Sequence, residues 1–69
     1  MSQTFTAVVH KEDDFYVAEC IEVGTASQGS SIEEAVANLS EATELYLDEF
    51  SYKPSPHPLL TTFEVPVHA

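Results

Sequence analysis

Apolar residues recur with the period of an α-helix in the stretch 30–50, SSIEEAVANLSEATELYLDEF. Spacings of three and four predict one buried side. That side is made of Ile32, Ala35, Val36, Leu39, Ala42, Leu45 and Tyr46. Ser31 suits an N-cap, and Glu34 three positions later completes a capping box. No glycine or proline interrupts the run, so the pattern predicts a helix over about residues 31–50.

Two stretches before this helix alternate with the period of two that is typical of β-strands. Residues 4–11, TFTAVVHK, place Phe5, Ala7 and Val9 on one face. Residues 15–23, FYVAECIEV, are apolar on both faces near their start. One face of this second strand carries Tyr16, Ala18 and Cys20, and the other carries Phe15, Val17, Glu19 and Ile21. The acidic residues 12–14 between the two stretches predict a polar turn.

The remaining segments differ in composition. The small residues of GTASQGS predict a short third strand at about 25–29, which would let the helix approach the sheet closely. Three alternating prolines in SYKPSPHPL predict an extended connector over residues 51–59. Residues 60–67, LTTFEVPV, predict a last strand, and Pro66, which lacks an amide donor, favours a position at a sheet edge.

The predicted order is β-β-β-α-β, an α+β fold in a single domain of residues 1–69. Three strands with short links form an antiparallel meander, and a right-handed crossover through the helix returns the fourth strand beside the first. The expected sheet order is therefore 3-2-1-4, with the helix on one face. Because the second face also needs a cover, and because a core this small gives little stability, we expect a homodimer or a higher homo-oligomer.

Composition indicates the cellular compartment. Cys20 is the single cysteine of the 69 residues, so no internal disulfide can form, and a lone thiol suits a reducing compartment. No apolar run approaches the ~20 residues of a membrane span. The N-terminus, MSQTFTAVV, lacks the basic region of a signal peptide. These features together predict a cytoplasmic protein.

Charge excludes two classes of partner. Twelve Asp and Glu oppose two Lys and Arg, and the formal net charge is −10. Nucleic acids and anionic membranes are bound mainly through clustered Lys and Arg, and Lys11 and Lys53 are not clustered. Direct binding to either is not expected. The acidity favours a basic partner or serves solubility alone.

The chain also carries a resemblance to a known family. The segments FTAVVHKEDDFYVAEC, SQGSSIEEAVANLSEATELYLDEF and TTFEVPV together resemble the HicB-like antitoxins of bacterial toxin–antitoxin systems. The most specific parts are Ser27-Gln28-Gly29, the helix opening at residues 31–35 and its end at residues 44–47. The Leu-Pro-Gly-Cys element usual in the family is replaced here by residues 20–24, Cys-Ile-Glu-Val-Gly.

The resemblance implies a truncated RNase-H-like fold and a type II antitoxin that neutralises a small basic, HicA-like, RNA-cleaving toxin. The chain looks like a short, stand-alone member without the C-terminal DNA-binding domain that many members carry. The residues expected to meet the toxin are Glu34, Glu41, Glu44, Asp48 and Tyr52. Tyr52 is either an exposed interface anchor or packed under the connector. The alternative function is a stand-alone oligomeric binding or scaffold domain of the same fold.

Three kinds of chemistry are alternatives to an antitoxin. A metal-dependent nuclease of RNase-H-like fold needs an acid in its first strand, and residues 4–10 contain none. A metal site from His10, Cys20, His57 and His68 lacks any recognised ligand spacing. Cys20 could meet His10 on a neighbouring strand, but a buried structural thiol is the favoured interpretation. We therefore expect no enzymatic activity, no metal and no cofactor.

Overall fold

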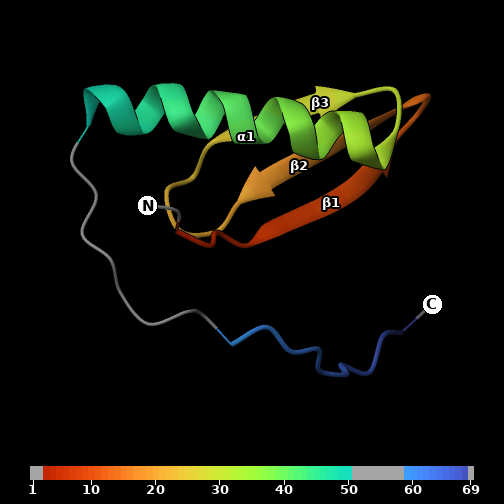
Figure 1. Ribbon diagram of the computed structural model, residues 1–69. Helices are drawn as coiled ribbons and strands as arrows, with labels where there is room; N and C mark the ends of the chain where they lie inside the picture. The colour runs from red at the N-terminus through yellow and green to blue at the C-terminus, as the bar shows by residue number, and fades with distance from the viewer. Residues whose placement is uncertain (1–2, 51–58, 69) are drawn as a thin grey trace.

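Three strands and one helix are present in the computed structural model, which describes residues 3–50 and 59–68. The strands are β1 (Ala7–Glu12), β2 (Phe15–Cys20) and β3 (Ala26–Gly29), and the helix α1 spans Ile32–Glu49. The strands pair antiparallel in the order β1-β2-β3, and α1 lies across one face of the sheet (Figure 1). The α+β class and the three-stranded meander are confirmed.

The β1–β2 hairpin fixes which side chains share a face. Glu12 lies opposite Phe15, and the tight turn between them holds Asp13 at φ 51°, a left-handed conformation that aspartate tolerates better than most residues. Val9 lies opposite Ala18, which is fully buried, so these two side chains face the helix. The faces expected from the alternation of β1 and β2 are therefore confirmed, with Phe15 and Val17 half-buried on the side that α1 does not cover.

Strand β3 and the helix approach each other closely, as was expected from the small residues of β3. A Cβ atom added to Gly29 would lie 2.6 Å from the backbone nitrogen of Ala35. Real side chains do not come so near to a backbone atom, so the absence of a side chain at Gly29 permits the contact. Directly before β3, the hydroxyl of Thr25 forms a hydrogen bond of 2.7 Å with the hydroxyl of Thr43 in α1.

The helix begins and ends close to its predicted boundaries. Ser31 is the N-cap, and its hydroxyl accepts a bond of 3.1 Å from the backbone N–H of Glu34. The Glu34 carboxylate reaches past the cap and accepts from the backbone N–H of Ser30. At the other end, Phe50 is the C-cap and stacks on Tyr46 with ring centroids 4.8 Å apart.

The buried side of α1 differs from the expected one. Ala35, Leu39 and Thr43 are buried, whereas Ile32 and Leu45 are 49% and 62% exposed. Val36, also expected in the core, is 38% exposed. The helix packs mainly over β2 and β3 and only lightly over β1, so its flank on the β1 side has no strand beneath it. The core is correspondingly small and consists of Ala18, Cys20, Ala35 and Leu39, with Phe5, Val9, Tyr16 and Val23 packed against it.

The predicted fourth strand is absent from the described part of the chain. Residues 59–68, called the tail below, form no strand, and every residue from 59 to 68 is exposed (Figure 1). The expected order 3-2-1-4 is therefore wrong for this structure, which has three strands. A strand forms only when its amides meet a neighbouring edge, and the tail does not lie against the edge of β1. Most of the predicted connector 51–59, including Tyr52, lies outside the described residues.

Candidate functional site

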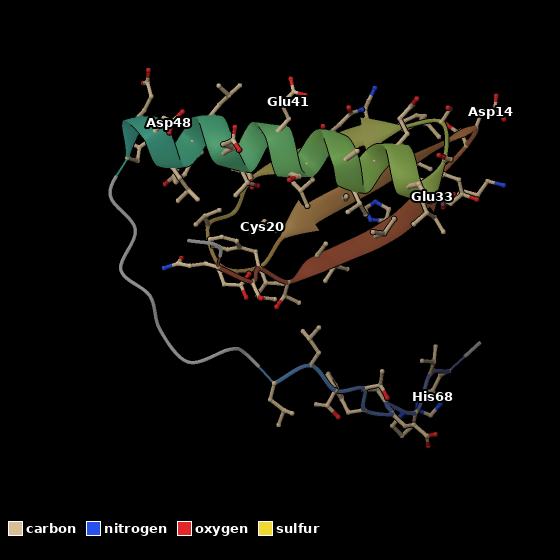
Figure 2. The ribbon with its side chains drawn as sticks, viewed as in Figure 1. Asp14, Cys20, Glu33, Glu41, Asp48 and His68 are labelled. Carbon is tan, nitrogen blue, oxygen red and sulfur yellow. The ribbon has the colours of Figure 1, made fainter. Side chains whose placement is uncertain are left out.

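The polar side of α1 carries three exposed carboxylates in one line. Glu41, Glu44 and Asp48 are spaced by three and four positions, which places them on adjoining turns of one helix face. Figure 2 shows Glu41 and Asp48 pointing away from the sheet. We call these three residues the acidic row. It covers about 10 Å along the helix axis, two turns at 1.5 Å per residue.

The acidic row lies where the helix itself is already electronegative. The last turns of a helix expose carbonyl groups and carry the negative end of the macrodipole. Acidic Glu33 and Glu34 occupy the first turn favourably, but the last turn contains Asp48 and Glu49 and no basic residue. Lys11, at the far end of β1, lies over the ring of Tyr16 at 6.0 Å. The row therefore forms a negative surface that a cationic group from outside would stabilise.

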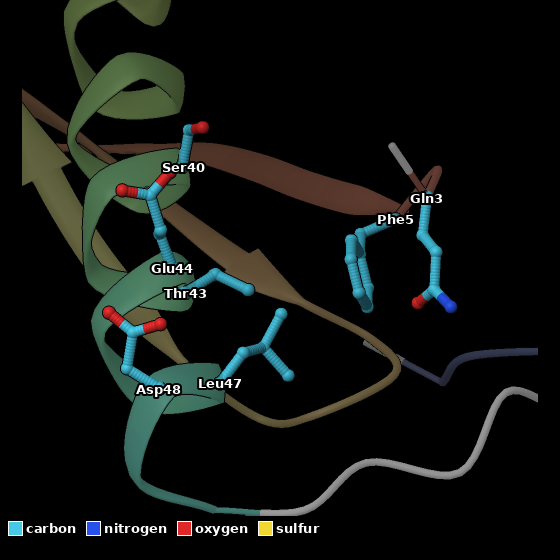
Figure 3. A pocket seen from close by; sticks show the side chains of 7 residues that line it. All are labelled: Gln3, Phe5, Ser40, Thr43, Glu44, Leu47 and Asp48. Atoms are coloured by element: carbon cyan, nitrogen blue, oxygen red, sulfur yellow. The ribbon is translucent and has the colours of Figure 1, made fainter. Parts of the chain in front are cut away.

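A groove runs beside the acidic row between α1 and the segment that leads into β1. It has a volume of about 370 Å³. Figure 3 shows the apolar side chains of Phe5 and Leu47 facing each other across it, with Glu44 and Asp48 on the helix side. Its lining is completed by Gln3, Ser40 and Thr43. Apolar walls next to carboxylates suit a lysine or arginine side chain, which has an aliphatic stem and a charged head.

Glu34 is set apart from the acidic row. It lies seven positions before Glu41, near the start of the helix, and its carboxylate accepts from both the backbone N–H and the hydroxyl of Ser30. The bond from the Ser30 backbone N–H is the largest of the causes that lower the pKa of Glu34. Of the four acids expected to bind a partner, three thus form one surface, while Glu34 helps to cap the helix.

The other candidate chemistry is not assembled. His10 lies opposite Val17 on the outer face of the sheet, whereas Cys20 is buried on the helix face opposite Ala7. A Cys–His contact is therefore ruled out by the register, and the buried-thiol interpretation is confirmed. Within the described residues, no group of three or more His, Cys, Asp or Glu is placed to hold a metal ion. His57 is not among them, and no described helix is both long and apolar enough to cross a membrane.

Glu22, which the sequence reasoning did not single out, joins the turn after β2 to the segment that precedes β1. Its carboxylate accepts bonds of 2.8 Å from the backbone N–H and from the hydroxyl of Thr6. The Cys20 thiol donates a longer bond of 3.6 Å to the same carboxylate. The bond from the Thr6 backbone is the largest cause of the lowered pKa of Glu22, and desolvation opposes it. Because Thr6 and Glu22 are 16 positions apart, no local sequence motif predicts the contact.

This contact makes stability depend on pH. A carboxyl group whose pKa is lowered by folding stabilises the fold above its unfolded pKa, and this stabilisation is lost as the pH falls through the folded pKa. We expect Glu22→Gln to lower the free energy of unfolding at neutral pH, and the difference from the native chain to shrink below about pH 4. Urea unfolding of both proteins at the two pH values is the measurement.

Acidification also neutralises other carboxylates, so Glu19→Gln is the matched control. Glu19 is exposed on the outer face of the sheet and loses the same charge. Its free energy of unfolding should follow that of the native chain at both pH values. An effect of Glu22→Gln that is equally large in acid would contradict the role given to the ionised carboxylate.

Comparisons of this chain with protein-family models, with curated proteins and with solved structures find no match.

Proposed function

We propose that this chain is a non-enzymatic antitoxin that binds and neutralises a small basic RNA-cleaving protein. One observation carries the proposal: the acidic row Glu41, Glu44 and Asp48 is exposed at the electronegative half of α1, with no basic residue in the last turn. Like charges at these spacings destabilise an isolated helix. A cationic partner would relieve that cost, which solubility alone does not require.

The proposed mechanism is competition for the cationic groups of the toxin. A protein that cleaves RNA must present lysine and arginine to the phosphates. The acidic row offers carboxylates to the same groups, and the groove beside Phe5 and Leu47 offers apolar surface to their aliphatic stems. Once these groups are engaged, RNA no longer reaches the toxin surface. No catalytic step by this chain is needed.

The resemblance to HicB-like antitoxins supports the same proposal and adds a finer one. In it, the three-stranded sheet with one helix is the core of a truncated RNase-H-like fold, and the protein acts in the bacterial cytoplasm. The observation that supports this finer proposal is the coarser one, a three-stranded antiparallel sheet with one helix. A short basic protein, if one is encoded beside the gene of this chain, is the toxin to test.

Removing the charge of the acidic row should slow association with that protein. We expect the triple variant Glu41→Gln, Glu44→Gln, Asp48→Asn to keep its fold, since all three side chains are exposed. Its association rate at low salt should fall about tenfold or more, the lower end of what electrostatic steering supplies. Raising the salt should slow the native chain until the two rates converge, because the Debye length is only about 8 Å at physiological ionic strength. Stopped-flow mixing measures both rates.

The chain offers a control with the same change in charge. The variant Glu12→Gln, Asp13→Asn, Asp14→Asn also removes three exposed carboxylates, at the β1–β2 turn. Asparagine tolerates the positive φ of position 13. This control should keep most of the native association rate. Equal rates for the native chain and the acidic-row variant at low salt would show that the row is only solvated.

A further inference from the structure

The sheet has one open edge, and it belongs to β1. The backbone N–H of Ile21 donates to the carbonyl of Thr6, and hydrogen-bonded pairs alternate along an antiparallel ladder. The amides and carbonyls that point away from β2 are therefore those of Ala7, Val9 and Lys11. None of the residues 3–50 and 59–68 bonds to these groups.

The opposite edge of the sheet is closed by the helix. The outward carbonyl of Gln28 in β3 accepts a bond of 2.8 Å from the side-chain amide of Asn38. Helix α1 also packs directly against β3. The helix and the engaged Gln28 carbonyl obstruct an added strand at β3, so β1 is the edge that can accept one.

The helix flank above β1 carries the apolar side chains of Val36 and Leu47 among polar ones, and no described strand lies beneath it. Ser40 and Leu47 line the groove together with Gln3 and Phe5, which lead into β1. Val36 is one helical turn before Ser40 and so lies on the same flank, where it is 38% exposed. A side chain projecting from a strand next to β1, on the helix side, would lie beneath this flank.

The tail has the sequence that such a strand needs. Phe63, Val65 and Val67 alternate with Thr62, Glu64 and Pro66. All are exposed, Phe63 to 84%. In a strand the N–H and C=O of one residue point to the same side, and Pro66 has no N–H. Pairing through the whole tail therefore requires the backbone of Phe63, Val65 and Val67 to face β1, and that of Pro66 to face away.

Strand direction then decides where the apolar side chains go. In an antiparallel pair, residues that exchange hydrogen bonds lie opposite each other with their side chains on one face. Phe63, Val65 and Val67 would join Lys11, Val9 and Ala7 on the helix side, beneath Val36. In a parallel pair, a residue whose backbone N–H and C=O face the neighbouring strand lies opposite a residue of that strand whose own N–H and C=O face away. Its hydrogen bonds go to the two residues on either side of that one. The same three side chains would then join Val8 and His10 on the outer face, away from the helix.

Within one chain, the tail has the direction that is less suitable for this packing. Helix α1 ends near the start of β1, and the tail runs in the same direction as β1 (Figure 1). We propose that the edge of β1 binds the tail of a second copy of this chain, antiparallel, with Phe63, Val65 and Val67 packed beneath the helix flank. Reciprocal exchange of tails gives a dimer with two-fold symmetry. It also enlarges a core that holds no large, fully buried side chain among the described residues.

Charge sets the conditions for this dimer. Each copy has a formal charge of −10, so the two repel at low salt. The segments that meet carry few charges, because residues 7–11 of β1 contain one Lys and residues 62–68 of the tail contain one Glu. Dimerisation should therefore strengthen as salt is added, which is the opposite of the salt effect on binding a basic toxin. The opposite salt effects distinguish the two proposals.

Two proline variants test the pairing without disturbing the monomer, since the tail is exposed throughout. Val65→Pro removes an N–H that faces β1, whereas Glu64→Pro removes one that faces away. In sedimentation equilibrium at moderate salt, the native chain and Glu64→Pro should dimerise. Val65→Pro should dissociate with a constant about tenfold or more higher, as expected when about 1.4 kcal/mol is lost. A native chain that stays monomeric up to hundreds of micromolar, or equal effects of the two prolines, would overturn the proposal.

Cross-linking separates exchange from closure within one chain. His10→Cys and Glu64→Cys, whose side chains would lie opposite each other on the outer face of the proposed pair, are made in separate proteins, each also carrying Cys20→Ala, and are mixed with a short bis-maleimide. A mixed covalent dimer, reduced in amount when Val65→Pro is added to the Glu64→Cys protein, supports exchange. If both cysteines in one chain instead link within a monomer while the mixture gives no dimer, the tail closes on its own β1, and the proposal is wrong.

Discussion

Leu39→Ala should remove most of the stability of this protein. Leu39 is 5% exposed and is the largest side chain in a buried core whose other members are Ala18, Cys20 and Ala35. Truncation of a buried leucine costs about 2–5 kcal/mol through lost transfer energy and the cavity left behind. A single core in a chain this small supplies about 3–5 kcal/mol. We expect the variant to be largely unfolded at 25 °C, as measured by circular dichroism and urea titration.

Leu45→Ala is the matched control for this loss. It makes the same change in the same helix, at a side chain that is 62% exposed. The free energy of unfolding should change by no more than about 0.5 kcal/mol, as at other surface sites. Because Leu45 belongs to the side that the sequence pattern expected to be buried, the pair also tests the observed rotation of the helix. Similar losses from both variants would contradict it.

Gly29→Ala should have the second largest effect. The new Cβ would lie 2.6 Å from the backbone nitrogen of Ala35 and 2.9 Å from the carbonyl carbon of Glu34. Backbone atoms at a helix start cannot move aside as a flexible side chain can, so β3 and α1 must separate. Overpacking of this kind costs about 1–3 kcal/mol, read from the midpoint of urea unfolding.

Substitutions at Gly24 serve to separate this steric clash from the cost of placing a side chain at a backbone conformation that favours glycine. Gly24 has φ 82°, and a Cβ there would meet nothing within 4 Å. Asparagine accepts left-handed φ better than alanine does. Gly24→Asn should therefore cost less than Gly24→Ala. At Gly29, where space is limiting, the asparagine variant should cost at least as much as Gly29→Ala. A milder effect of asparagine at Gly29 would refute the steric explanation.

The sequence predicted features that depend on neighbouring positions. The alternation in β1 and β2 identified their faces, and Ser31 marked the first turn of α1. The rotation of the helix was mispredicted because apolar residues lie on both flanks of the buried line. Thr43 belongs to that line although it is polar, because its hydroxyl is bonded to Thr25 across a separation of 18 positions. Periodicity alone carries no information on such a partner.

In the tail and in the candidate site, too, local sequence patterns predicted some features, whereas others depend on tertiary packing. Alternation in 60–67 indicated a strand, but a strand also needs an edge to pair with, which a local pattern cannot supply. The line of Glu41, Glu44 and Asp48 follows from spacing on a helix and was predicted. The contribution of Phe5 and Leu47 to the adjoining groove depends on how β1 and α1 pack, and was not.

Inhibition of RNA cleavage tests the central claim most directly. A candidate toxin, a short basic RNA-cleaving protein sought among the genes next to this one, is mixed with a labelled RNA and increasing amounts of this chain. Cleavage should stop near an equimolar ratio, for the native chain and for the variant neutralised at the β1–β2 turn. The variant neutralised at Glu41, Glu44 and Asp48 should need a large excess. Cleavage that continues unchanged in an excess of the native chain would contradict the proposed function.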